Sequence, residues 1–505
     1  MTIVEMLEIH AQNIPDHTAI IYDDITISYS EFNNKVNKLF HAFVDMGINK
    51  GDVVGLMLPR IPELVISFLA IAKTNGVVMP INFELFDNKI RALLQNTTPK
   101  CLIVDEKYVD LAKRSIPSGS DIFVVVVGNN NYKDYLNWDE VLRDKDSTSP
   151  FSNITQRDVV YLNYTSGTTG NPKGAITTHE QIYRNTLAAV DAFNLTEDDI
   201  HLCMFAPFAH PHEIFARPLY LGGTMVLLDK IYPKSLAKTI ADHRVTCMMG
   251  LPPMYNTLLD LLEHYEYDLS SLRIPESGGM YTRQELIDRF KQKIGVPILP
   301  VWGSTETTGI AIANRPDEDM IPGSVGKPCK SYEVKIIDDK GDEVAANDVG
   351  EILFKGPAVV SGYYEDIINT NDCFRNGWYC SGDLGKKDAE GNIYFVERKA
   401  GMMKVAGLKV YPLEIELAII EHPNIREVAV IALKDRLRGE VPKAIIVTSN
   451  GERITQKDVL KFCRGKMTHY KIPRIVEIRE SLPKIGSGKI NKKLLQMEEY
   501  GCEVS

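Results

Sequence analysis

The sequence predicts an α/β fold, with a large N-terminal body of helix-covered, mostly parallel sheets, a short β-rich subdomain and a small α+β domain at the C-terminus. Strand-like and helix-like segments alternate as far as about Tyr332, short strands with tight turns follow, and the pattern changes again after Arg398. Strand–helix–strand units build parallel sheets whose faces are covered by helices. We therefore expect two domains, residues 1–398 and residues 399–505.

The first amphipathic helix is expected over residues 31–47. Its apolar residues Phe32, Val36 and Leu39 recur with the helical period. A serine hydroxyl can accept a hydrogen bond from a free backbone N–H of the first turn, and Ser30 stands where such a cap is needed. This segment is therefore predicted to cover one face of a sheet.

A strand–helix–strand unit follows. Residues 52–58, "DVVGLML", have the composition of a buried strand, and residues 77–82 of a second strand. The helix between them, residues 62–76, is expected to end at Gly76, because glycine readily adopts the left-handed conformation that closes helices. The same alternation returns between residues 224 and 306, which extends the predicted sheet-and-helix body.

The last third of the chain has a different pattern of secondary-structure signals. Residues 334–344 and 386–397 contain Asp-Lys-Gly and Ala-Glu-Gly-Asn, which are typical of hairpin turns. Residues 411–423 are expected to form a helix with Pro412 in its first turn and carboxylates near its positive end. Two strands and a helix follow at residues 427–433, 443–449 and 455–466.

Composition and charge narrow the class of protein. With 44% hydrophobic and 25% charged residues, the 505-residue chain resembles an ordinary globular enzyme. A net charge of −10 argues against general nucleic-acid binding, because a phosphate backbone attracts the opposite sign. From Arg398 to the C-terminus, however, 21 Lys and Arg face 13 Asp and Glu. This excess indicates either a surface that faces a polyanion or random surface variation.

The sequence also indicates a cytoplasmic location. Residues 1–17 lack the basic and apolar regions of a secretory signal. The longest apolar run, Leu64–Ala72, is too short to span a bilayer, so no transmembrane segment is expected. The eight cysteines form no Cys-x-x-Cys pair, which favours reduced thiols over disulfides or a zinc site.

The stretch "YTSGTTGNPKGA", residues 164–175, carries the first chemical signal. Glycines allow close backbone approach, and hydroxyls with successive backbone N–H groups can surround anionic oxygens. The stretch lacks the Gly-Lys-Ser/Thr ending of a Walker loop, so it is predicted to be a different polyphosphate loop, or alternatively a flexible surface hairpin. The candidate phosphate ligands are Thr165, Ser166, Gly167, Thr168, Thr169 and Lys173.

Four further motifs follow in a fixed order. They are "GSTETT" at residues 303–308, "WYCSGDLG" at 378–385, "ERKAGMMKVAGLKVYPLEIE" at 397–416 and "LPKIGSGKINKKLL" at 482–495. With the phosphate loop, they resemble the motifs of the adenylate-forming superfamily of acyl-CoA synthetases, amino-acid adenylation domains and beetle luciferases. The resemblance covers nearly the whole chain, and it implies an ATP-dependent ligase with a mobile C-terminal domain.

The resemblance implies a role for each nucleotide-site residue. Glu306 would hold Mg²⁺ among phosphate oxygens, for which a carboxylate at the end of a strand is suited. Thr305 would bond the α-phosphate, and Trp302 stands where the family usually has a tyrosine near adenine. Asp383 would accept hydrogen bonds from the ribose hydroxyls. The remaining nucleotide-site residues by resemblance are Gly278 and Arg398, the latter also opening the hinge.

The C-terminal motifs imply the groups that serve the reaction itself. Lys489 would bridge the attacking carboxylate and the α-phosphate, where its charge offsets the growing negative charge. Gly407 would line a tunnel for the pantetheine arm of coenzyme A. Lys409 and Arg464 are candidates for contacts with the phosphates of coenzyme A. The implied cofactors and substrates are ATP, Mg²⁺, coenzyme A and a carboxylic acid.

The implied reaction has two halves: formation of acyl-AMP and pyrophosphate, then attack of a thiol on the acyl carbon after the C-terminal domain rotates. The acceptor could be free coenzyme A or a carrier protein. An amino-acid activating domain, a luciferase-like oxygenase and a catalytically weak nucleotide-binding regulator remain alternatives, and a homodimer is left open. The resemblance also implies a role in fatty acid metabolism.

The acid is not specified by the sequence. The segments around Met248, Met249, Met280 and Tyr281 are candidate pocket walls, and their adaptable apolar character suits a medium-chain or aromatic acid. Methionines in a large enzyme are, however, more often part of the core. The family's histidine-containing pocket motif matches "APFAHPHEIFARPLYLGG" poorly, so that His210 or His212 could be its equivalent.

Several positions depart from the family's pattern. Ala400 and Gly401 stand where the hinge usually has Asp or Lys followed by Asp, and Ala406 stands where glycine is usual. Lys492 replaces an arginine and Ser381 a threonine. None of these departures removes a catalytic group, but they put the movement of the hinge region in doubt.

Overall fold

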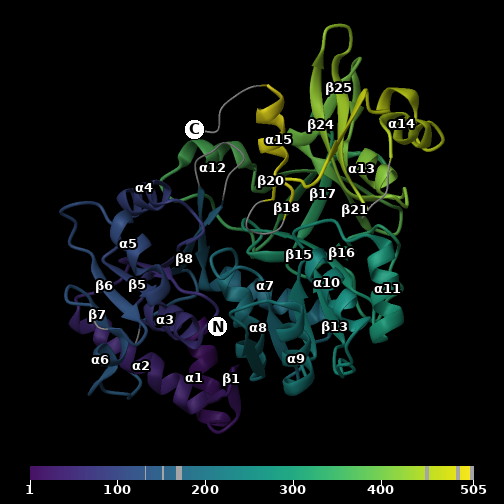
Figure 1. The fold of residues 1–505 in the computed structure, drawn as a ribbon. Helices are drawn as coiled ribbons and strands as arrows, with labels where there is room; N and C mark the ends of the chain where they lie inside the picture. The colour runs from purple at the N-terminus through teal and green to yellow at the C-terminus, as the bar shows by residue number, and fades with distance from the viewer. Residues whose placement is uncertain (131, 151–152, 166–172, 450–453, 485–488, 501–505) are drawn as a thin grey trace. The chain divides into compact units, whose positions relative to one another are not determined.

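The computed structural model describes residues 1–505 except 131, 151–152, 166–172, 450–453, 485–488 and 501–505. It divides into two compact units (Figure 1). Unit 1 comprises Met1–Val334 and Phe354–Tyr379, and unit 2 comprises Lys335–Leu353 and Cys380–Ser505. The predicted boundary between residues 398 and 399 concerns motion and stays a prediction.

The first sheet of unit 1 has seven strands in the order β7-β6-β5-β3-β4-β8-β9. Its neighbours are parallel, except that β8 and β9 are antiparallel. An apolar core of buried Val, Leu, Ile and Met side chains packs against it. The strands are β3 (Val53–Met57), β4 (Val77–Pro80), β5 (Cys101–Asp105), β6 (Phe123–Val127), β7 (Leu136–Asn137), β8 (Val159–Thr165) and β9 (Lys173–Thr178).

The second sheet of unit 1 has nine strands in the order β16-β15-β14-β13-β12-β10-β11-β1-β2. Its centre is parallel, and β2, β15 and β16 pair antiparallel at the two ends. The strands are β1 (Thr18–Tyr22), β2 (Ile25–Ser28), β10 (Ile200–Cys203), β11 (Thr224–Leu227), β12 (Cys247–Gly250), β13 (Ile274–Ser277), β14 (Leu299–Ser304), β15 (Gly309–Ala313) and β16 (Lys327–Pro328).

Helices cover these sheets, as the alternating pattern predicted (Figure 1). They are α1 (Ile3–Asn13), α2 (Tyr29–Asp45), α3 (Pro62–Lys73), α4 (Asp87–Thr97), α5 (Val109–Ser115), α6 (Trp138–Leu142), α7 (His179–Phe193), α8 (Ala216–Leu221), α9 (Pro233–His243), α10 (Pro252–Leu262) and α11 (Gln284–Ile294). Unit 1 also contains α12 (Ile367–Cys373). The predicted mixed α/β class is therefore confirmed.

Two details of the helix ends were predicted wrongly. The cap of α2 is Ser28, not Ser30: its hydroxyl accepts from Glu31 N while the Glu31 carboxylate accepts from Ser28 N. Helix α3 ends at Lys73, and the left-handed residue after it is Asn75 (φ +61°), not Gly76. Asparagine tolerates that conformation because its short side chain can bond locally.

A third sheet has the strand order β17-β18-β20-β19, with β21 paired to β20. A fourth, in unit 2, has the order β23-β22-β25-β24 with β26 beside β25. The strands are β17 (Glu333–Ile337), β18 (Gly350–Lys355), β19 (Phe374–Arg375), β20 (Trp378–Lys387), β21 (Ile393–Arg398), β22 (Met403–Val405), β23 (Leu408–Val410), β24 (Ile425–Asp435), β25 (Gly439–Thr448) and β26 (Ile475–Arg479).

Three helices complete unit 2: α13 (Pro412–Ile420), α14 (Gln456–Arg464) and α15 (Lys492–Glu499). The predicted start of α13 is confirmed, with Pro412 in its first turn and Glu414 near its positive end. Apolar side chains of α13, α14 and the fourth sheet form one core. The C-terminal segment is thus a compact α+β element, as predicted.

Candidate active site

The predicted phosphate loop lies between two paired strands. The backbone of Thr165, at the end of β8, is opposite Lys173, at the start of β9. Lys173 is half-buried, and its Nζ lies 5.3 Å from the centroid of the Tyr363 ring. The predicted ligands Ser166, Gly167, Thr168 and Thr169 lie outside the described residues. The structure therefore fixes the two strands and the position of the loop's lysine.

Glu306 lies in a tight turn directly after β14. The turn is closed by a bond from Thr308 N to the carbonyl of Thr305 (3.0 Å), and the Thr308 hydroxyl donates to the carbonyl of Ala358 (2.7 Å). Glu306 is buried, and its Oε1 accepts a 2.6 Å hydrogen bond from the hydroxyl of Tyr363. The predicted metal carboxylate is thus held within the fold of unit 1, beside the half-buried Thr305.

Tyr363 was missed by the sequence analysis. Burial, and then the neighbouring Glu306 charge, raise the pKa of Tyr363 far above its ordinary value, so its hydroxyl is a neutral donor. Nothing in "SGYY" distinguishes this tyrosine from Tyr364. The contact with Glu306 spans 57 positions of the sequence, and only the fold brings the two residues together.

Trp302 lies on β14 of the nine-stranded sheet, and Gly278 directly follows β13, the neighbouring parallel strand. Trp302 is buried, and one face of its indole stacks on Phe354, with ring centroids 4.3 Å apart and planes 4° apart. Gly278 is buried beside Val301, where an added Cβ would approach the valine to 3.0 Å. Both residues therefore stand near the carboxyl edge of the sheet, where open α/β sheets bind ligands.

Asp383 and Arg398 are opposite each other on β20 and β21 in unit 2. Asp383 is buried, and its Oδ1 lies 2.7 Å from Arg398 Nε. Ser381 accepts from Asp383 N (3.0 Å) and donates to the carbonyl of Ile352 (2.6 Å). Serine at this position therefore keeps the hydroxyl that the family's threonine would supply.

Lys489 belongs to the same part of unit 2. Burial and the charge of Arg398 lower the pKa of its ammonium, while the charge of Asp383 raises it. The segment that carries it is anchored by pairing between Lys484 and Ile490. Three of the predicted site residues, Lys489, Arg398 and Asp383, are therefore electrostatic neighbours.

Lys492 shows how that segment is fixed. Its Nζ lies 2.7 Å from Oε1 of the buried Glu416, which also accepts from Val430 N (2.6 Å). A lysine therefore serves at the position where the family usually has an arginine. The carboxylate is on α13 and the lysine on α15, so the pair joins the two helices.

The three residues expected to serve coenzyme A lie on separate elements of unit 2. Gly407 (φ +82°) follows Ala406 (φ +50°) in the turn between β22 and β23, a conformation that costs alanine more than glycine. Lys409 Nζ lies 2.8 Å from a carboxylate oxygen of Asp339. Arg464 is the exposed last residue of α14.

The predicted hinge residues, Ala400 and Gly401, belong to a short 3-10 turn, Lys399–Gly401, between β21 and β22. Glu397 spans this turn. Its Oε1 accepts from Arg398 N and its Oε2 from Leu413 N, both at 2.9 Å. The carboxylate is buried, so the residues on the two sides of the turn are joined by one acid.

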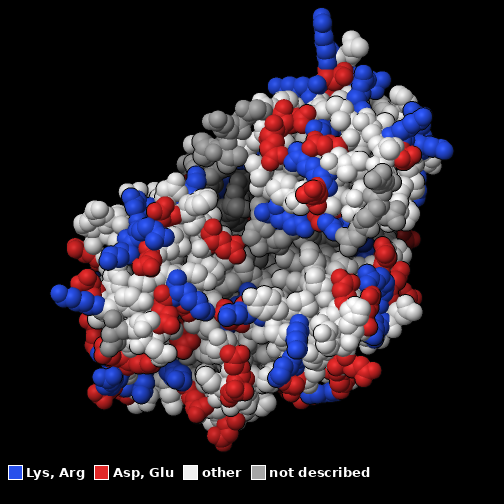
Figure 2. All heavy atoms as spheres, viewed as in Figure 1, with Lys and Arg blue, Asp and Glu red and all other residues white. Residues whose placement is uncertain are grey.

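Many of the basic residues after Arg398 form ion pairs within unit 2. Lys443, which is buried, contacts Glu477 (2.7 Å) and Glu499 (2.5 Å), and Lys484 contacts Glu427 (3.0 Å). Figure 2 shows acidic and basic side chains intermixed around α15, and basic ones at the outer end of the β24–β25 hairpin. Whether the positive excess faces a polyanion stays a prediction.

Two histidines were candidates for the acyl pocket. His212 is fully buried, its Nδ1 lies 2.8 Å from the hydroxyl of Tyr161, and burial lowers its pKa to about 3, which keeps the imidazole neutral. His210 is half-buried, 6.4 Å from Phe205 between ring centroids. Of the two, His210 is the more accessible. The candidate Met248 is part of the core against the nine-stranded sheet.

A buried charge cluster was also missed. Arg217 is shared between two carboxylates: Nη1 lies 2.7 Å from Glu276 Oε1, and Nη2 lies 2.9 Å from Glu213 Oε2. All three side chains are buried. The desolvation of Glu276, opposed by Arg217 and assisted by the charge of Glu213, raises its pKa to about 7. The raised pKa of Arg217 reports the same attraction from the cation's side.

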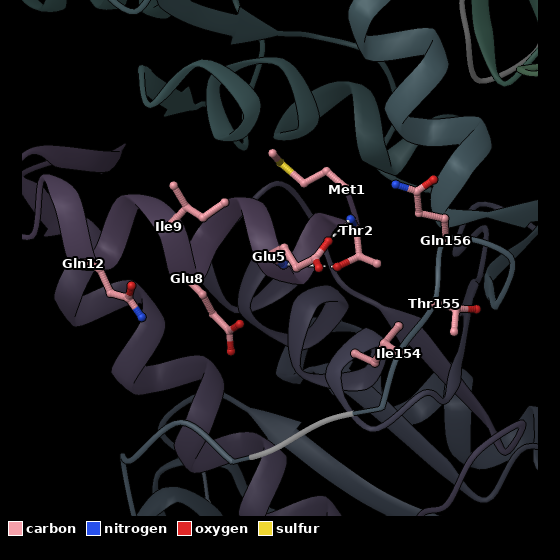
Figure 3. A pocket seen from close by; sticks show the side chains of 9 residues that line it. All are labelled: Met1, Thr2, Glu5, Glu8, Ile9, Gln12, Ile154, Thr155 and Gln156. Atoms are coloured by element: carbon pink, nitrogen blue, oxygen red, sulfur yellow. Dashed lines mark hydrogen bonds between the residues drawn. The ribbon is translucent and has the colours of Figure 1, made fainter.

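The structure also contains a hollow of about 660 Å³ beside the N-terminus (Figure 3). None of the predicted site residues lines it. The Glu5 carboxylate is bonded to Thr2 N (2.6 Å), and Glu8 contacts Lys73 (2.7 Å). Its acids are therefore engaged in the local fold. The lining residues are Met1, Thr2, Glu5, Glu8, Ile9, Gln12, Ile154, Thr155 and Gln156.

Among the residues that the structure describes, no helix is long and apolar enough to cross a membrane. In the same part of the chain, no three His, Cys, Asp or Glu side chains are grouped as metal ligands.

Comparison with known proteins identifies relatives along the whole chain. The AMP-binding enzyme family matches residues 7–364, and the AMP-binding enzyme C-terminal domain matches residues 414–489. A long-chain-fatty-acid–CoA ligase of Bacillus subtilis (strain 168) is 30% identical over 531 residues, covering 99% of this chain and 94% of the relative.

Two solved structures share the fold. The anthranilate CoA ligase AuaEII in complex with anthranoyl-AMP has a TM-score of 0.90 at 29% identity, covering 99% of this chain and 97% of that chain. ATP-bound MatB from Rhodopseudomonas palustris has a TM-score of 0.91 at 27% identity, covering 99% of each chain. The expected resemblance and fold are thus confirmed.

Proposed function

This chain belongs to the AMP-binding enzyme family of AMP-forming acid–thiol ligases, and we propose that it couples a medium-chain or aromatic carboxylic acid to free coenzyme A through an acyl-AMP. The observation that carries the proposal is the grouping of Lys489, Arg398 and Asp383 in unit 2. It combines a carboxylate able to bind a ribose diol with two cations suited to a phosphate.

The first half-reaction would use these residues as follows. A carboxylate oxygen of the acid forms a bond to the α-phosphorus of ATP, and the bond from that phosphorus to the leaving pyrophosphate breaks. Lys489 would stabilise the negative charge that develops where the two anions meet. Asp383 would orient the ribose, and Thr305 would donate to the α-phosphate.

Mg²⁺ would supply positive charge to the phosphate oxygens. Glu306 fits this role, because it is a held carboxylate at the end of a strand, with Lys173 nearby across Tyr363. Trp302 and Gly278 would contact the adenine, with the indole held flat by Phe354. Lys173, Thr165 and the loop residues 166–169 would surround the β- and γ-phosphates.

In the second half-reaction the thiol sulfur forms a bond to the acyl carbon, and the bond from that carbon to the oxygen of AMP breaks. We propose that residues 399–505 turn against residues 1–398 between the two steps, so that the Gly407 turn replaces Lys489. Lys409 would have to leave Asp339 before it could meet a phosphate of coenzyme A, and Arg464 is the second proposed contact.

The class of acid is supported by two observations. The half-buried Met280 and Tyr281 are adaptable apolar side chains beyond the carboxyl end of β13. One relative of the same fold binds an aromatic acyl-AMP, anthranoyl-AMP. His210, near Phe205, would lie at the carboxylate end of the pocket. The cytoplasmic location and a homodimer stay predictions.

The test is pyrophosphate release by the purified full chain with Mg²⁺ and ATP, across short, medium, long-chain and aryl acids. We expect acid-dependent release, highest with medium-chain or aryl acids, and acyl-CoA formation when coenzyme A is added. Transfer only to a phosphopantetheinylated carrier protein would replace coenzyme A as the acceptor. If none of the acids in the panel supported pyrophosphate release, the proposed function would be contradicted.

A further inference from the structure

We infer that Tyr363 is a positioning residue of the Mg²⁺–ATP site, which fixes the Glu306 carboxylate and connects it to the phosphate-loop strand β9. This inference rests on the proposed function of Glu306. It adds a residue that none of the sequence motifs contains.

The hydroxyl of Tyr363 and the carboxylate of Glu306 form a buried pair. The distance from the hydroxyl oxygen to Oε1 is 2.6 Å, and the two residues are 5% and 8% exposed. An ionised carboxylate can only accept, so the tyrosine donates. A hydrogen bond to a charged group is stronger than one between neutral groups, and this one fixes which oxygen of Glu306 remains available to a cation.

The ring of the same tyrosine faces the lysine of the loop. Lys173 Nζ lies 5.3 Å from the ring centroid, within the range of a cation–π contact. Tyr363 therefore contacts an anion through its hydroxyl and a cation through its ring. These are the two charged groups expected to hold the phosphates and their metal ion.

The backbone on either side reinforces this arrangement. Tyr363 pairs with Ala175 of β9, Tyr364 N donates to the carbonyl of Gly174 (2.8 Å), and Ile176 N donates to the carbonyl of Gly362 (3.1 Å). Residues 360–364 therefore form a strap along the strand that leaves the phosphate loop.

The other end of this strap joins the Glu306 turn directly. Val360 N donates to the carbonyl of Glu306 (2.9 Å), and the Thr308 hydroxyl donates to the carbonyl of Ala358 (2.7 Å). The strap is thus bonded to both predicted phosphate motifs within unit 1. Backbone hydrogen bonds hold the two ends of the strap, and the side chain of Tyr363 contacts the Glu306 carboxylate.

The test compares Tyr363→Phe with the matched control Tyr364→Phe, the adjacent tyrosine of the same strap. ATP binding is measured by equilibrium dialysis with excess Mg²⁺ and again with EDTA. The dissociation constant in EDTA divided by the dissociation constant with Mg²⁺ reports the metal-dependent part of binding. This ratio does not depend on the active fraction of the protein.

We expect Tyr363→Phe to reduce this ratio about tenfold, as the loss of a charged hydrogen bond implies, with binding in EDTA changed less than about twofold. The Mg²⁺ concentration for half-maximal pyrophosphate release should rise by a similar factor, with the KM for the acid unchanged. Tyr364→Phe should match the wild type in both measurements.

A double-mutant cycle isolates the contact. In a Glu306→Gln background, adding Tyr363→Phe should change the ratio less than about twofold. Equal effects in both backgrounds, or an unchanged ratio in the single variant, would overturn the inference. A wild-type protein that binds Mg²⁺–ATP but forms no acyl-AMP would contradict the proposed reaction and leave this comparison valid.

Discussion

Replacing Glu276 by glutamine removes one of the two carboxylates that share the buried guanidinium of Arg217. Glutamine keeps the shape and the oxygen that Arg217 Nη1 contacts at 2.7 Å. The second carboxylate oxygen of Glu276 has no hydrogen-bond partner among the described residues. The variant therefore tests one quantity, the cost of ionising this carboxyl in the folded protein.

The magnitude follows from the pKa of Glu276, which burial raises from 4.5 to about 7. Between these values the folded state binds more protons than the unfolded state, so the contribution of this carboxyl is present at low pH and is lost as the pH rises through 7. From about pH 5 to about pH 8 the wild type should lose about 2–3 kcal/mol relative to Glu276→Gln.

The assay is urea unfolding followed by tryptophan fluorescence at several pH values. All three tryptophans, Trp138, Trp302 and Trp378, belong to unit 1, which also contains Glu276. The buried histidines change the stability with pH in the opposite direction. The pKa of His212 is lowered to about 3, so this residue reduces the free energy of unfolding as the pH falls below 6.5, the ordinary pKa of histidine. Their effect is common to both proteins and cancels in the difference.

The control is Glu285→Gln, which removes an exposed carboxylate of α11. Its difference from the wild type should stay within about 0.5 kcal/mol at every pH. If the Glu276→Gln difference were equally flat, Glu276 would be ionised throughout and held by Arg217, and the reasoning from burial would be refuted.

Four further substitutions test the site and the fold. Lys489→Ala should slow acyl-AMP formation about 100-fold or more and spare thioester formation from supplied acyl-AMP; equal loss in both assays would make Lys489 structural. Glu306→Gln should raise the Mg²⁺ requirement of pyrophosphate release, and an unchanged requirement would exclude it as a ligand. Ala400→Pro, which fixes φ, should retain one half-reaction and lose the other. Equal retention of both half-reactions would mean that the hinge lies elsewhere. Equal loss of both, with a lower melting temperature, would indicate misfolding. Lys73→Met should lower the free energy of unfolding by about 1–3 kcal/mol, because it leaves Glu8 without its buried partner. Lys50→Met removes an exposed lysine from its pair with the half-buried Asp158, and it should change the free energy of unfolding by less than about 1 kcal/mol.

The sequence allowed most elements to be predicted, because their periodicity is local. The strand at residues 52–58 and the helix at residues 62–76 correspond to β3 and α3. The cap of α2 was predicted wrongly, although the capping pattern Ser28-x-x-Glu31 is present in the sequence. Helix ends depend on a few backbone angles, which composition alone does not determine.

The candidate site divides in the same way. Lys489, Asp383 and Glu306 stand in local motifs, so a single pass along the sequence could find them. Tyr363 and Glu276 act through contacts with residues 57 and 59 positions away. Such contacts depend on how sheets and helices pack, and no local pattern of residue types records them.

Glu397 forms a hydrogen bond that the proposed domain rotation would have to break, and the free energy of that bond can be estimated. Its carboxylate bonds Arg398 N before the Lys399–Gly401 turn and Leu413 N after it. If residues 399–505 rotate about that turn, the bond to Leu413 N has to open and close once in each turnover. A hydrogen bond to a charged acceptor contributes about 1.5–3 kcal/mol, which corresponds to a population bias of roughly ten- to a hundredfold. The resting enzyme would therefore wait mainly in one of its two orientations, and the choice would be set by a residue that touches neither substrate.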